Sequence, residues 1–63
     1  MVRQQVFNLQ VGDRFAFSED GDLCTVEERG MIDYHGDYLL LYRLGPLLFG
    51  HPTDHTPVWV LPA

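Results

Sequence analysis

The stretch YLLLYRLGPLLF, residues 38–49, decides the fold class of this chain. Its first seven residues are aromatic or aliphatic except for one arginine, and such residues favour a β-strand over 38–44. Gly45-Pro46 is a turn signal, and a short strand is predicted to follow over 47–49. The run over 38–44 is too uniformly apolar to assign its side chains to the two faces of a sheet.

Short strands separated by glycine or proline are predicted on both sides of this stretch. Arg14–Ser18 is predicted to place Phe15 and Phe17 on one face, with Arg14, Ala16 and Ser18 on the other. The remaining expected segments are a lead-in over 6–11 offering Val6, Phe7, Leu9 and Val11 to the core, a strand over 23–29 with Cys24 and Val26 inward, and a closing strand over 58–61.

No stretch carries apolar residues at helical spacing, and Gly or Pro interrupts the chain every few residues. Residues 50–56 are predicted to form a loop containing one tight helical turn, and residues 31–35 are either extended or irregular. The pattern predicts an all-β fold. We expect a single domain over 1–63, built as a five- to six-stranded antiparallel barrel whose core spans about 9–61, because closure removes exposed strand edges.

The charge of the chain restricts its partners. Nine carboxylates stand against four arginines and no lysine, and the net charge is -5. Phosphate binding depends on Lys and Arg, so nucleic acid and anionic membranes are not expected as direct partners. A protein with a basic surface is the expected partner, and the predicted contact residues are Glu19, Asp20, Asp22, Glu27, Glu28, Asp33 and Asp37. The alternative is that these carboxylates form a solvated, solubilising face.

Trp59 is the other predicted contact residue. If Val58 and Val60 point into the core, Trp59 points outward, where it would be a typical binding anchor. The opposite register buries Trp59 together with Leu61, and both registers remain open. An apolar patch extended by Tyr38, Leu40 and Tyr42 would equally serve a homodimer contact.

The loop from His51 to His55 is the one stretch with metal-binding character, through His51, Asp54 and His55. Spacings of this kind bind metal when a helix aligns both imidazoles, and Pro52 and Pro57 disfavour a helix here. We therefore predict a polar turn in which Thr53 or Asp54 accepts backbone hydrogen bonds, with no metal and no cofactor.

No catalytic group is predicted, and the chain is not expected to be an enzyme. Cys24 shares a strand face with Val26 and is interpreted as a small core residue. Residues 34–37 are interpreted as a solvated turn.

With one cysteine the chain has no internal disulfide, and neither a signal peptide nor a membrane span is predicted, so we expect a cytoplasmic location.

Three segments together resemble a known family: LQVGDRFAF over 9–17, LCTVEE over 23–28 and HPTDHTPVWVLP over 51–62. They are similar to free-standing Src-homology-3-like small β-barrels of bacterial and phage genomes. The resemblance implies a short helical turn before the last strand. Members of this family bind proteins or nucleic acids, or act as inhibitors. The acidic loop over 18–22 contains no aromatic residue, so the proline-rich peptide groove of the wider fold is not expected.

These observations favour a non-enzymatic protein-binding module. In its strongest form it is an acidic inhibitor of a basic nucleic-acid-handling protein, of phage or mobile-element origin, such as an anti-CRISPR-type or transcription inhibitor. One alternative is a self-associating structural or accessory barrel. The other is a metal site in the His51–His55 loop.

Overall fold

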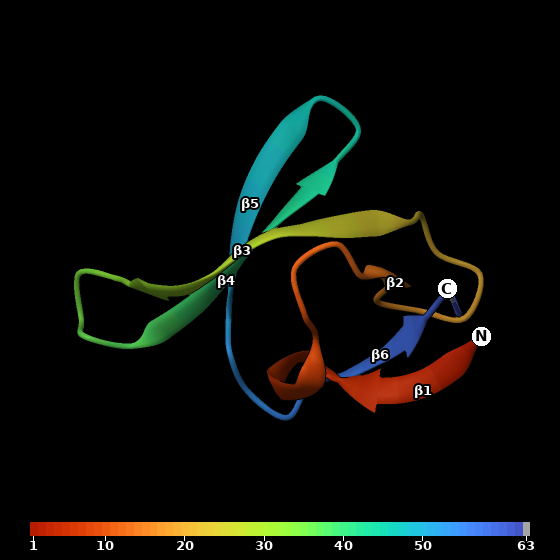
Figure 1. Ribbon diagram of the computed structural model, residues 1–63, viewed down its shortest axis with the longest axis horizontal. Coiled ribbons are helices and arrows are strands. Elements are labelled where there is room, and N and C mark those ends of the chain that lie inside the picture. Colours follow the sequence, from red (N-terminus) through yellow and green to blue (C-terminus); the bar gives the residue numbers. More distant parts are fainter. Residues whose placement is uncertain (63) are drawn as a thin grey trace.

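Six strands form one sheet in the computed structural model, which describes residues 1–62 (Figure 1). Every strand is antiparallel to its neighbours, so the all-β prediction is confirmed. The elements are β1 (Val2–Gln5), the 3-10 turn η1 (Val6–Asn8), β2 (Arg14–Ala16), β3 (Cys24–Ile32), β4 (Tyr38–Leu44), β5 (Leu47–Pro52) and β6 (Pro57–Val60).

The order across the sheet is β1-β6-β2-β3-β4-β5. Strands β2 to β5 follow one another as a meander, and β6 then returns to lie between β1 and β2. Within residues 1–62 the sheet is not closed, since β1 and β5 stand at its two ends. Closure into a barrel is therefore not confirmed.

Strand β3 is the longest strand and bends between the two halves of the molecule (Figure 1). Its register with β4 shifts twice, between Val26 and Glu28 and again between Arg29 and Met31. Gly30 lies in the second irregularity with a φ of +82°, which side chains rarely tolerate. Because of these bulges, β3 can pair with β2 through its first residues and with β4 along the rest of its length.

The core is small and centres on Phe15, whose neighbours across the sheet are Val60 on one side and Cys24 on the other. Predictions of inward-facing residues were correct for Phe15, Cys24 and Val26, and for part of the lead-in. The fully or nearly fully buried residues are Val6, Leu9, Phe15, Ala16, Cys24, Val26, Leu40 and Val58.

Two residue-level predictions about the core were wrong. Phe7 and Val11 are more than half exposed, because η1 and the turn after it direct only Val6 and Leu9 inward. Ala16, predicted to lie on the face opposite Phe15, is also completely buried. It lies directly opposite Trp59 in the register of β2 with β6, and a large cross-strand neighbour can cover a methyl group.

The ends of the sheet also differ from prediction. Residues 2–5 form an unpredicted strand paired with β6, although Val2 alone among VRQQ favours a strand. The predicted helical turn before the last strand is wrong: β5 continues to Pro52, two bend residues follow, and the 3-10 turn lies at η1 instead. Residues 51 and 52 are extended and paired with β4, up to the pair of Pro52 with Leu39, so they are not available for a helical turn.

Arg29 connects β3 to the N-terminal segment. Its guanidinium donates hydrogen bonds to the carbonyl oxygens of Leu9 and Phe7, the latter at 3.1 Å. These carbonyls belong to the segment that carries Val6 and Leu9 into the core. One side chain therefore holds the end of the 3-10 turn against the bent strand.

We predict that Arg29→Met lowers the free energy of unfolding by about 1.5–3 kcal/mol, the usual contribution of hydrogen bonds from a charged donor. Urea denaturation at neutral pH measures the change. Arg14→Met removes the same charge from an exposed side chain that makes no hydrogen bond or ion pair within residues 1–62, so it serves as the control. Equal losses in the two variants would show that the two carbonyl contacts are not stabilising.

Candidate interaction surfaces

The loop between β2 and β3 carries three of the predicted contact residues. A turn closed by the Gly21 N–H and the Ser18 carbonyl, at 3.1 Å, presents Glu19 and Asp20 at its tip. Glu19, Asp20 and Asp22 are exposed, and none of them has a side-chain hydrogen bond or ion pair within the described residues 1–62. We refer to residues 18–22 as the acidic loop.

The other four predicted carboxylates have different surroundings. Glu27 accepts a hydrogen bond at 2.7 Å from the Arg43 guanidinium on β4, so its charge is partly balanced. Asp33 is half-buried, and its Oδ1 accepts from the backbone N–H groups of His35 and Asp37, at 2.8 and 2.9 Å. Asp33 therefore shapes the β3–β4 turn, whereas Glu28 and Asp37 are exposed.

The fold places five of the seven carboxylates in two separate groups, with Glu27 and Glu28 on β3 between them. The acidic loop precedes β3, while Asp33 and Asp37 follow it, and the two lie at opposite sides of the molecule (Figure 1). A nine-residue strand spans roughly 25 Å. Because the Debye length at physiological salt is about 8 Å, the two groups do not reinforce each other's potential through solvent. The seven carboxylates therefore do not form one concentrated acidic surface.

Trp59 lies on the side of β6 opposite the core. Val58 is completely buried, whereas Trp59 and Val60 are half-buried. The guanidinium carbon of Arg3, on the paired strand β1, lies 5.1 Å from the centre of the indole ring. Trp59 is thus outside the core but covered on one face by a cation–π contact. The suggested patch through Tyr38, Leu40 and Tyr42 does not exist as a surface, since Leu40 is completely buried.

An aromatic cluster from three separate segments was not predicted. Phe17, just after β2, lies 5.4 Å from Tyr42 of β4 and 5.3 Å from His51 of β5, measured between ring centres. Phe49 of β5 stacks on Tyr42 at 5.5 Å. Phe17 and Phe49 remain 37% and 38% exposed, so the cluster reaches the surface. No local pattern signals it, because it depends on how β2, β4 and β5 come together.

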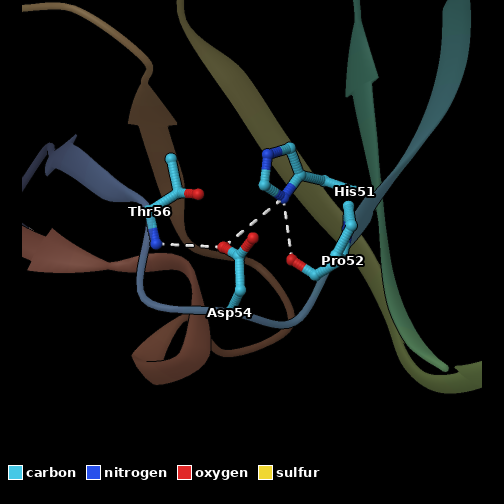
Figure 2. A network of polar contacts seen from close by, with 4 residues as sticks. All are labelled: His51, Pro52, Asp54 and Thr56. Carbon is cyan, nitrogen blue, oxygen red and sulfur yellow. Dashed lines mark hydrogen bonds and ion pairs between the residues drawn. The ribbon is translucent and has the colours of Figure 1, made fainter.

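The His51–His55 loop sends its two imidazoles to different partners. His51 Nδ1 lies 2.7 Å from the Pro52 carbonyl and 4.0 Å from Asp54 Oδ1 (Figure 2), whereas His55 Nδ1 lies 2.9 Å from Gln5 Oε1. Within residues 1–62 no three His, Cys, Asp or Glu side chains are grouped to hold a metal ion. The loop is instead a polar turn in which Asp54 accepts the Thr56 N–H at 2.9 Å (Figure 2).

Cys24 has the properties of a structural residue. It is 2% exposed, and its thiol lies 3.8 Å from the Asp22 carbonyl oxygen. Burial, and secondarily the negative charge of Asp22, raises the pKa of the Cys24 thiol. A thiol that stays protonated is a poor nucleophile, so its environment does not favour covalent catalysis.

No protein-family model, curated protein or solved structure matches this chain. Among residues 1–62 there is also no helix with the length and apolar character needed to span a bilayer.

The Asp54 contacts predict a dependence of stability on pH. Hydrogen bonds from Thr56, first from its side chain and then from its backbone, lower the pKa of the Asp54 carboxyl below its ordinary value of 3.8. A carboxylate with a lowered folded-state pKa stabilises the fold above the unfolded-state pKa, and this contribution is lost as the pH falls through the folded-state pKa. Because Asp54 is exposed, we expect Asp54→Asn to cost only about 0.5 kcal/mol at pH 7.

Urea denaturation of the wild type and Asp54→Asn, repeated at decreasing pH, measures this difference. It should be constant near neutrality and shrink below the ordinary carboxyl pKa. Asp20→Asn removes the same charge from a side chain that makes no hydrogen bond or ion pair within residues 1–62 and should change stability less at pH 7. A difference between wild type and Asp54→Asn that grows on acidification would contradict the assignment.

Proposed function

We propose that this chain is a non-catalytic protein-binding module whose acidic loop docks on a basic, nucleic-acid-binding surface of another protein. The observation that carries the proposal is the loop itself. Its three carboxylates are exposed, adjacent and without partners among residues 1–62. Elsewhere, Asp13, Asp33 and Asp54 each accept backbone hydrogen bonds, so those carboxylates already have a structural role.

Unpaired carboxylates close together repel one another and do not stabilise a small domain. The same carboxylates raise the local negative potential, which speeds the approach of a basic partner and orients it. A protein surface that binds phosphates with Lys and Arg is complementary to such a loop. Occupying that surface would exclude the nucleic acid, so the module would act as an inhibitor.

We further propose that the sheet is a partly open barrel of the Src-homology-3-like type, working in the cytoplasm and of phage or mobile-element origin. The meander from β2 to β5, with β6 returning beside β2 around one core, supports this fold type. Fold type does not select a function, so the proposal of inhibition depends on the acidic loop. Trp59, half-covered by Arg3, is a secondary contact in this proposal.

A metal-dependent function is not favoured, because the two imidazoles of the His51–His55 loop have separate partners. Self-association remains the second candidate, and a specific feature of β5 favours it, as argued below.

The proposal predicts that Glu19→Gln, Asp20→Asn and Asp22→Asn together abolish binding to the basic partner without unfolding the domain. The partner would first be captured from a nuclease-treated bacterial lysate at about 50 mM salt and released at about 500 mM, where screening is strong. Its affinity for duplex nucleic acid would then be measured by fluorescence anisotropy with increasing amounts of the domain. We expect the wild type to displace the nucleic acid and the triple variant to displace none.

The control keeps the acidic loop and changes the net charge equally. Val2→Lys, Val11→Lys and Tyr34→Lys alter three exposed side chains, and both triple variants move the net charge from -5 to -2. If the lysine variant lost competition as fully as the neutralised loop, net charge and not the loop would be responsible. A captured protein that keeps its nucleic acid in the presence of the wild type would overturn the proposal.

A further inference from the structure

Strand β5 ends the sheet, and its outer side has no neighbouring strand within residues 1–62. The β4–β5 hairpin projects from the rest of the molecule (Figure 1). Leu47, Leu48 and Phe49 are 59%, 51% and 38% exposed, and Gly50 is exposed as well. This edge is therefore open to a further strand along most of its length.

The hairpin geometry tells which backbone groups are free. Leu44 and Leu47 close a two-residue turn in which Gly45 has a φ of +59°, as the first central residue of a type II′ turn requires. In such a hairpin the hydrogen-bonded pairs alternate from the turn, so residues 47, 49 and 51 bond to β4. The N–H and C=O groups of Leu48 and Gly50 consequently point away from the sheet.

Natural sheets protect such an edge with charges, short strands, bulges or proline. The opposite edge, β1, has this protection, being four residues long with a central arginine. Strand β5 has six residues, no Asp, Glu, Lys or Arg, and a single proline at its last position. Its register with β4 is continuous from Leu44 and Leu47 to Leu39 and Pro52, without a bulge.

We propose that β5 pairs antiparallel with β5 of a second copy of this chain, with the two-fold axis at Phe49. The backbone N–H and C=O groups of Leu48 in each copy then form hydrogen bonds with those of Gly50 in the other copy. This gives two hydrogen-bonded residue pairs, one on each side of Phe49. The contact is isologous and therefore closes as a dimer. It joins the two six-stranded sheets into one continuous sheet.

Side-chain shape favours a second copy over an unrelated strand. Leu48 of one copy stands opposite Gly50 of the other, where no side chain competes for space. Because Gly50 has no side chain, the space above it is free on the face that Leu41 and Leu39 share. A β carbon at Gly50 would lie 3.5 Å from a δ carbon of Leu41 and 3.6 Å from one of Leu39. Leu48 would therefore extend the apolar outer face formed by these two leucines of β4.

The other face of the sheet has an equivalent fit. Phe49 stacks on Tyr42 of β4, and the two-fold axis brings the two Phe49 side chains opposite each other as a non-hydrogen-bonded pair, where side chains approach most closely. An aromatic pair at that position would continue the stack from one sheet into the next. The unpredicted aromatic cluster thereby gains a contact on its exposed side.

Charge does not oppose the contact locally. Neither β5 nor its turn carries Asp, Glu, Lys or Arg, and the one histidine, His51, faces Leu47 of the other copy, so the pairing places no like charges opposite each other. The net charge of -5 on each copy opposes association only at longer range. Stable interfaces bury about 800 Å² per partner, and a single strand edge buries less, so we expect a reversible dimer at high protein concentration.

The salt dependence of this contact is opposite to that of the proposed basic partner, and the inference does not rest on that function. Screening reduces the repulsion between two acidic copies, so dimerisation should strengthen from about 50 to about 500 mM salt, while binding of a basic surface should weaken. Failure of one proposal leaves the other intact, because the acidic loop and β5 are different surfaces.

Sedimentation equilibrium over a range of concentrations tests the dimer. We expect Leu48→Lys, which places a charge at the pairing edge, to raise the dissociation constant at least about tenfold. Val11→Lys adds the same charge at an exposed site outside the strands and should have no effect. Circular dichroism confirms that both variants fold. A wild type that stays monomeric at every concentration, or the same dissociation constant in both variants, would overturn the proposal.

Cross-linking tests the register. In a Cys24→Ala background, Phe49→Cys places two thiols at the axis, where opposed residues of a non-hydrogen-bonded pair lie close enough for a disulfide. Leu47→Cys faces residue 51 of the other copy and should not cross-link with itself. Efficient cross-linking of Leu47→Cys, or open-ended fibres in place of a dimer, would contradict two-fold pairing at Phe49.

Discussion

The bend of β3 is the constraint on which the rest of this structure depends. A chain of 63 residues has few core side chains, and a flat sheet could not enclose them. Two register shifts bend β3, so that it starts beside β2 and then runs along β4. Cys24 and Val26 of β3 and Leu40 of β4 therefore pack in the same core as Phe15. Gly30 makes the second shift sterically accessible.

The same bend places Arg29 where it can hold the N-terminal segment. Its contacts to the carbonyls of Leu9 and Phe7 fix η1 against the sheet, and η1 in turn supplies Val6 and Leu9 to the core. In larger domains a single side chain of this kind is one contact among many. In a domain of this size it adds to the backbone hydrogen bonds that join Gly12 and Asp13 to Val26 of β3.

The carboxylates divide according to whether the fold uses them. Asp13, Asp33 and Asp54 satisfy backbone N–H groups in turns, and Glu27 pairs with Arg43. Those in the acidic loop stabilise nothing within the described residues, which makes the loop the part of the surface best suited to a partner. Edge strand β5 presents the opposite chemistry, uncharged and apolar, and net negative charge limits uncontrolled association through it. Contacts made through the two surfaces are therefore expected to respond to salt in opposite directions.

The sequence by itself determined the fold class, most strand positions and the inward residues Phe15, Cys24 and Val26, because alternation and turn residues are local signals. It also indicated that Thr53 or Asp54 would accept backbone hydrogen bonds, and Asp54 is the one that does. Only the tertiary structure decided the rest. The VRQQ strand exists because β6 pairs with it, and the helical turn expected before β6 is replaced by extended pairing in β5.

The acidic loop lies far from Asp33 and Asp37 because β3 separates them, and the aromatic cluster forms because three distant segments meet. Pairing partners and long-range contacts of this kind leave no periodic trace in a sequence. They depend on which strands become neighbours, and that is settled when the whole chain packs around its core.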